Sequence, residues 1–206
     1  MSNPTPDTSI SGIITAIKGD LRAAMNGIAS RAIRESGMGY KLTYGVELPR
    51  LREIAACYTA DRHLAQALWQ ENIREYKMLA IILYPHDEFN SDIATLWIED
   101  LIPEQAEIAQ LMCLDLISTQ PYSAEYAFRW MADERQMFQL CGFLVITRLL
   151  MHGAQLSPTS ESEFFDQADA ARFTTYLPLR KTVYNALSRY SETSETAAKR
   201  VNDLLT

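Results

Sequence analysis

The sequence predicts an all-α fold, a curved superhelix of stacked antiparallel helix pairs. Apolar residues recur at steps of three and four along nearly the whole 206-residue chain, which is the spacing of one helix face. Sustained alternation of apolar and polar residues, the pattern of a half-buried strand, does not occur in the sequence. The helical segments are short and each has one apolar face, so they must stack on one another to bury it.

The first helical region covers residues 8–35, where apolar residues, Met25 and Ile28 among them, keep the three- and four-residue spacing. Gly27 is expected to bend this region or to divide it in two, and Gly37 is available for a left-handed cap at its end. Three helices follow. Pro49 suits the first turn of one, because proline lacks only an N–H that would be unpaired there. Asp61 is the expected N-cap of the second, over residues 61–70, and the third covers residues 73–84.

Pro, Gly and capping residues divide the rest of the chain into further helices. These are predicted over residues 91–101, 103–115, 123–131, 135–152, 160–170, 178–190 and 194–205. Leu96 and Trp97 are expected to face inward, and the strongly apolar segment 135–152 is expected at the centre. Ser160 and Glu163 have the spacing of a capping box. Residues 1–206 are expected to form a single domain.

Composition indicates a globular protein without a membrane span. The chain is 48% hydrophobic, its apolar runs are too short to cross a bilayer, and its start lacks a secretory pattern. Cys57, Cys113 and Cys141 stand singly in apolar helical patterns and are expected to be buried free thiols, so the cytoplasm is the expected location. No Cys/His spacing indicates a metal site, and no cofactor is expected.

The net charge of −7 is unevenly distributed along the chain. Residues 86–170 carry three basic residues against fifteen acidic ones, whereas the two flanking stretches are mildly positive. Binding to duplex DNA needs Lys and Arg against phosphates. The acidic middle block is therefore expected to be an ordinary solvated face, which would repel a phosphate backbone unless it points away.

Four groups of residues, in their order and separation, carry a resemblance to a known family. They are Tyr44-Gly45-Val46 with Pro49, Leu51 and Arg52; Leu68-Trp69; Arg74-Glu75-Tyr76 with Leu79 and Ala80; and Leu179-Arg180-Lys181 with Ala186, Leu187 and Tyr190. These residues resemble the bacterial alkylpurine-DNA glycosylases built from HEAT-like repeats. The resemblance implies a HEAT-like superhelix whose concave face grips duplex DNA, and removal of positively charged N-alkylated purines without a metal.

Breaking the glycosidic bond builds positive charge on the sugar, which a carboxylate stabilises while aromatic faces hold the cationic base and an arginine anchors a phosphate. The family's aspartate falls near Asp115, but Leu111 takes the place of its preceding tryptophan. The family's arginine pair falls near Leu140 and Cys141, and its closing tryptophan at Asn185. The resemblance thus predicts a carboxylate without its partners, and excision activity that is weak or lost.

Asp115 is accordingly the candidate catalytic residue, with the alternative that it is an exposed or locally bonded polar side chain. The candidates for contact with DNA phosphates are Arg50, Arg52, Arg74, Lys77, Arg180 and Lys181. The alternative for these six is an ordinary solvated helix face, because Glu47, Glu53 and Glu75 interleave with them. Trp69 stands at helical spacing with Leu residues and is expected in the core.

Two functions follow from the sequence. The first is a diverged alkylation-repair protein that binds duplex DNA through backbone contacts, with weak or no base excision. The second is a non-enzymatic HEAT-like module that binds a protein partner in its concave groove. The matched motifs favour the first, and the acidic middle block favours the second.

Overall fold

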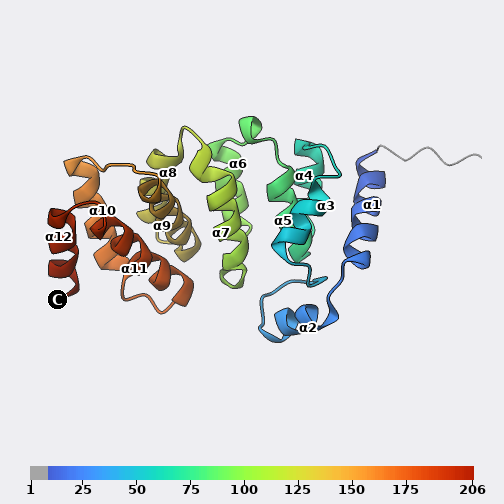
Figure 1. Ribbon diagram of the computed structural model, residues 1–206, viewed down its shortest axis with the longest axis horizontal. Coiled ribbons are helices and arrows are strands. Elements are labelled where there is room, and N and C mark those ends of the chain that lie inside the picture. The colour runs from blue at the N-terminus through green and yellow to red at the C-terminus, as the bar shows by residue number, and fades with distance from the viewer. Residues whose placement is uncertain (1–8) are drawn as a thin grey trace, which may run out of the picture. The chain divides into compact units, whose positions relative to one another are not determined.

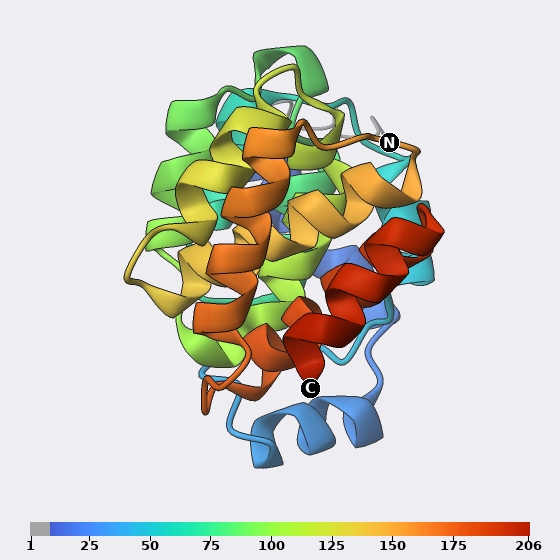
Figure 2. The same cartoon turned by 90° about the vertical axis from the view of Figure 1, so that its left-hand side faces the viewer.

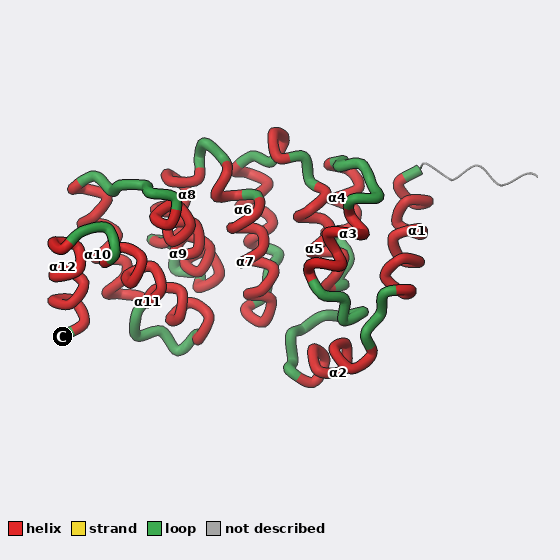
Figure 3. Tube along the Cα trace, viewed as in Figure 1, coloured by secondary structure: helices red, strands yellow, loops and turns green. Residues whose placement is uncertain are grey.

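The computed structural model describes residues 9–206, and in this part of the chain the all-α prediction is confirmed. Twelve α-helices and three short 3-10 helices make up its regular structure, with one isolated bridge between Leu42 and Ile73 (Figure 3). The helices gather in two compact units, which we describe separately. The first ends at Glu88, and the second covers Phe89–Thr206. The single domain expected over residues 1–206 stays a prediction.

The first unit contains five α-helices and one 3-10 helix. They are α1 (Ile10–Ala23), α2 (Gly27–Glu35), α3 (Leu48–Ala55), α4 (Arg62–Trp69), α5 (Arg74–Leu83) and η1 (His86–Glu88). Helix α5 packs against α3 and α4, and α1 packs against the same two helices. Helix α2 lies across the ends of the other helices of its unit (Figures 1 and 2). Asp61 is the N-cap of α4, as predicted, since its Oδ1 accepts the Leu64 N–H at 2.8 Å.

The second unit contains seven α-helices and two 3-10 helices. They are α6 (Ser91–Glu99), η2 (Pro103–Gln105), α7 (Ala106–Asp115), η3 (Ile117–Thr119), α8 (Ser123–Met131), α9 (Gln136–Met151), α10 (Pro158–Ala171), α11 (Leu177–Ser191) and α12 (Glu195–Leu205). Helix α9 packs against α6, α7, α8 and α11, which confirms its predicted central place. Gly142 lets α8 approach closely, because a Cβ there would lie 2.6 Å from the carbonyl oxygen of Ala127.

Several packing predictions are wrong. The first helical region divides at Gly27, as expected, and Asn26 caps the separate helix α2, so Met25 and Ile28 are 57% and 86% exposed although they keep the helical spacing. Leu96 is 59% exposed. Cys57 is exposed because α3 ends at Ala55. Helix α10 also begins earlier than predicted, with Ser157 as its N-cap. The expected start at residue 8 lies outside the described residues.

Candidate nucleic-acid interface

Residues 43–46 and 74–76 form one buried clasp in the first unit. The side chain of Glu75 is completely buried, and its carboxylate accepts the Thr43 hydroxyl at 3.0 Å. It also accepts the backbone N–H groups of Tyr44 and Gly45, both at 2.9 Å, and that of Val46 at 3.3 Å. Burial of a carboxylate is costly unless such donors surround it. The motifs that carry the family resemblance therefore hold the scaffold together.

Gly45 brings α2 against this clasp. Its φ of +69° lies in the left-handed region, and an added Cβ would lie 2.4 Å from both the Asn26 carbonyl oxygen and the Ser30 nitrogen. Ser30 donates its hydroxyl to the Thr43 carbonyl at 2.7 Å, and the Asn26 N–H donates to the Tyr44 carbonyl at 3.0 Å. The position of α2 on its unit is thus fixed by backbone contact and hydrogen bonds.

Two of the six predicted phosphate contacts belong to this scaffold. The Arg74 side chain is 12% exposed, donates to the Val46 carbonyl at 3.1 Å and lies 3.3 Å from the Glu75 carboxylate. Lys77 is buried, donates to the Trp69 carbonyl at 3.2 Å and lies 4.2 Å from the centre of the Trp69 ring. Both cations are engaged inside the first unit, so we withdraw them from the candidates for DNA contact. The sequence does not reveal this, because the Val46 carbonyl that Arg74 contacts lies 28 residues away in the chain.

Exposed basic residues gather instead between residues 18 and 52. This stretch carries seven Lys and Arg residues, all exposed, against three acidic residues, a net charge of +4. We call the seven the basic segment: Lys18, Arg22, Arg31, Arg34, Lys41, Arg50 and Arg52. Sequence reasoning identified two of them, and a count of charge over shorter windows would have found the rest.

Two members of the basic segment are already in ion pairs. Arg31 lies 2.7 Å from Glu35, and Arg50 lies 2.6 Å from Glu53. All four side chains are well over half exposed, and pairs of this kind contribute at most about 1 kcal/mol. A phosphate can therefore replace the glutamate at little cost.

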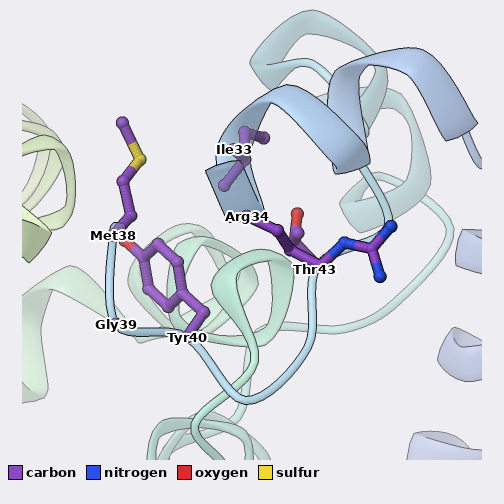
Figure 4. Close-up of a pocket in the computed structure, with 6 residues that line it drawn as sticks. All are labelled: Ile33, Arg34, Met38, Gly39, Tyr40 and Thr43. Atoms are coloured by element: carbon purple, nitrogen blue, oxygen red, sulfur yellow. The ribbon is translucent and has the colours of Figure 1, made fainter. Parts of the chain in front are cut away.

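A small pocket of about 130 Å³ adjoins the basic segment at the end of α2 (Figure 4). Ile33 and Arg34 reach it from α2, and Met38 and Tyr40 from the loop that follows. The loop turns with the help of Gly37 and Gly39, whose φ angles are +74° and +69°. Arg34 is the one charged side chain among the residues that line the pocket, and its guanidinium extends away from Met38 and Tyr40, so the pocket lacks an acid–base pair (Figure 4).

The second unit holds the positions at which the resemblance places catalytic groups. Asp115 is half-buried at the end of α7. Leu111 is buried, and so are Leu140 and Cys141 on α9, where the resemblance would place arginines. Asn185 is exposed on α11. The structure thus places one carboxylate in this region, with apolar core at the positions of its expected partners.

The thiols of Cys113 and Cys141 in this region are buried. The Cys113 sulfur lies 3.8 Å from the Cys141 carbonyl oxygen, and burial together with Cys141 raises the pKa of the Cys113 thiol well above its ordinary value.

Arg180 and Lys181 are exposed on α11, in a unit whose net charge is −7. Trp69 is buried, as predicted.

Residues 9–206 hold neither a candidate metal site nor a helix that could span a membrane. No group of three or more His, Cys, Asp or Glu side chains in this range could hold a metal ion. Within the same range no helix combines the length and the apolar character needed to cross a bilayer.

Fold and surface together define an all-α protein of stacked short helices with a basic stretch in its first unit. The sequence matches the profile of the DNA alkylation repair enzyme family over residues 17–200, and the chain belongs to that family. No curated protein matches the sequence.

Among solved structures, the chain is similar to one that represents "a new family of proteins related to the HEAT-like repeat DNA glycosylases with affinity for branched DNA structures". The TM-score is 0.75, over 92% of this chain and 80% of the other, at 13% sequence identity. This likeness confirms the predicted HEAT-like all-α fold.

Proposed function

We propose that this protein binds duplex DNA, and branched DNA in particular, through phosphate contacts of its basic segment, with weak or no base excision. Arg180 and Lys181 are its proposed second contact, on α11. The observation that carries the proposal is the net charge of +4 over residues 18–52, in a chain whose total is −7. Branched DNA enters the proposal because the structurally similar protein has affinity for it.

The exposure of the basic segment supports a phosphate-binding role. Guanidinium and ammonium groups at a surface can release the counterions of DNA, and this supplies most of a sequence-independent affinity. Membership of the DNA alkylation repair enzyme family is consistent with DNA as the partner. Weak or absent excision is supported by the burial of Leu140 and Cys141, because no phosphate anchor can extend from those positions.

Binding is tested by fluorescence anisotropy with a labelled duplex across a salt series. We expect the double variant Arg50→Ala with Arg52→Ala to lower affinity and to reduce the slope of log K against log salt by about 1 for each phosphate that is no longer neutralised. Arg129→Ala is the matched control, since Arg129 is an exposed arginine of α8. Absence of duplex binding at low salt, or an equal effect of all variants, would refute the proposal.

Excision is tested by base release from duplex DNA that contains N-alkylated purines. We expect no release above the uncatalysed background, either for the wild-type protein or for Asp115→Asn. Release by the wild type that Asp115→Asn abolishes would show that Asp115 is catalytic, and would overturn this half of the proposal.

One observation favours the second candidate, a protein-interaction module. The second unit has a net charge of −7 and exposes Phe173 and Leu177 at 70% and 52%. Large exposed apolar side chains suit a protein partner rather than a phosphate backbone. If DNA binding fails in the anisotropy experiment, this function takes precedence.

A further inference from the structure

Two large apolar side chains at the start of α2 are exposed. Ile28, in the first turn, is 86% exposed, and Met25, just before the N-cap, is 57% exposed. Figures 1 and 2 show α2 across the ends of the other helices of its unit, where it is accessible from outside. Large exposed apolar side chains that are three residues apart in the chain are candidates for a binding surface.

The first unit holds these two side chains in place rigidly. Backbone atoms of Asn26 and Ser30 press against Gly45, and two hydrogen bonds tie α2 to residues 43 and 44. Because α2 cannot roll inward, Met25 and Ile28 have no route into the core. A surface that is already ordered in this way loses little conformational entropy when a partner covers it.

Basic residues are frequent in the chain around Met25 and Ile28, which we call the apolar tip. Arg31 stands one turn after Ile28, on the same face of α2, because residues three apart on a helix are neighbours. Between residues 22 and 41 the chain carries four basic residues and one acidic residue, Glu35. An apolar centre with a cationic rim is complementary to the flat face of a base pair bordered by phosphates.

Two partners share that chemistry, nucleic acid and an anionic membrane surface. An interfacial membrane helix buries an apolar face built of side chains such as Trp, Phe and Leu, whereas Ile28 is the one large apolar side chain that α2 exposes. The observations therefore favour nucleic acid.

We infer that Met25 and Ile28 pack on the terminal base pair exposed at a DNA branch point, while Arg31 and Arg34 contact the adjoining phosphates. This inference rests on the proposed function. In a linear duplex the same side chains could reach a base face only by unstacking it, which costs a few kcal/mol per step. At a branch point the base pair at the opening is already accessible. The tip thus distinguishes branched from linear DNA without reading sequence.

The experiment compares a four-way junction with a linear duplex of the same length and sequence. The variant is Ile28→Ser with Met25→Ser, and both sites are exposed, so folding is retained. Leu96→Ser, at a 59% exposed position of α6, is the matched control. Circular dichroism verifies that all three proteins are folded.

We expect the wild type to prefer the junction, and the double variant to lose about tenfold or more in junction affinity, which is the effect of burying one such side chain. Its duplex affinity and salt slope should stay within about twofold of wild type, because the phosphate contacts remain. Leu96→Ser should behave as wild type.

Other outcomes separate the inference from the function it rests on. Duplex binding without junction preference, or a preference that the double variant keeps, refutes the inference and leaves the proposed function standing. A wild type that binds neither DNA refutes both. Loss of binding to phosphatidylserine vesicles in the double variant, with junction preference unchanged, would assign the tip to membranes instead.

Discussion

The hydrogen bonds of the buried Glu75 carboxylate allow us to predict how the substitution Glu75→Gln changes the free energy of unfolding. In Glu75→Gln the side chain keeps its shape, but one carboxylate oxygen becomes an NH₂ group that donates and cannot accept. Oε1 accepts hydrogen bonds from the Thr43 hydroxyl and the Gly45 N–H, whereas Oε2 accepts one from the Tyr44 N–H at 2.9 Å. With the amide oxygen at the Oε1 place, the Tyr44 N–H faces another donor.

The cost follows from these contacts. A hydrogen bond to a charged group contributes about 1.5–3 kcal/mol, and a buried N–H left unpaired costs about 1–3 kcal/mol more. We therefore expect Glu75→Gln to lower the free energy of unfolding by roughly 3–5 kcal/mol, a large part of the typical total of about 5–15 kcal/mol.

Urea unfolding followed by circular dichroism measures this loss, and hydrogen exchange locates it. The amides of Tyr44, Gly45 and Val46 should exchange faster in the variant than the amides of α9. Glu53→Gln is the control, because Glu53 is 64% exposed and its ion pair contributes at most about 1 kcal/mol. A loss below about 1 kcal/mol for Glu75→Gln, with unchanged exchange at the three amides, would refute the clasp as the main polar anchor of the first unit.

Three further predictions concern the same scaffold and the last helices. Gly45→Ala should cost about 3 kcal/mol or more in urea unfolding, because its Cβ would overlap backbone atoms and its φ of +69° strains any other residue. Lys77→Ala should lower stability by about 1.5–3 kcal/mol because it removes the hydrogen bond to the Trp69 carbonyl, with duplex affinity per folded molecule unchanged in anisotropy. The Tyr190 hydroxyl donates to Glu161 and, with Arg200, lowers the pKa of that carboxyl, so this stabilisation is present above the unfolded pKa of about 4.3 and is lost as pH falls through the folded value. In thermal scans Tyr190→Phe should therefore melt below wild type at pH 7, and the difference should shrink below about pH 4.

Local patterns in the sequence were sufficient to predict most of the fold. Asp61 caps α4 as its position before an apolar helix predicts, and the apolar run of α9 lies at the centre of its unit. The region 8–35 divides at Gly27, as expected, and Asn26 caps the new helix, so Met25 and Ile28 are exposed although they keep the helical spacing.

The candidate site was predicted less well, because exposure depends on contacts between distant residues. Arg74 and Lys77 have the sequence character of surface cations, yet the loop at residues 43–46 and the Trp69 ring enclose them. Arg50 and Arg52 were identified correctly as exposed residues. The exposed tip of α2 could not be foreseen, since it follows from the close approach at Gly45, which no local pattern encodes.

The same geometry bears on whether base excision could be introduced into this chain. By the family resemblance, we propose that base excision would require an arginine near residue 140 or 141 to hold a phosphate beside Asp115. Leu140 is 2% exposed and Cys141 is completely buried, so an arginine at either place would put an unpaired charge into the core of the second unit. Such a charge costs several kcal/mol, which is comparable with the whole stability of many domains. A single arginine substitution would therefore destabilise the second unit and would not create an active site. An active variant would also need new packing of α9 against α7 and α11.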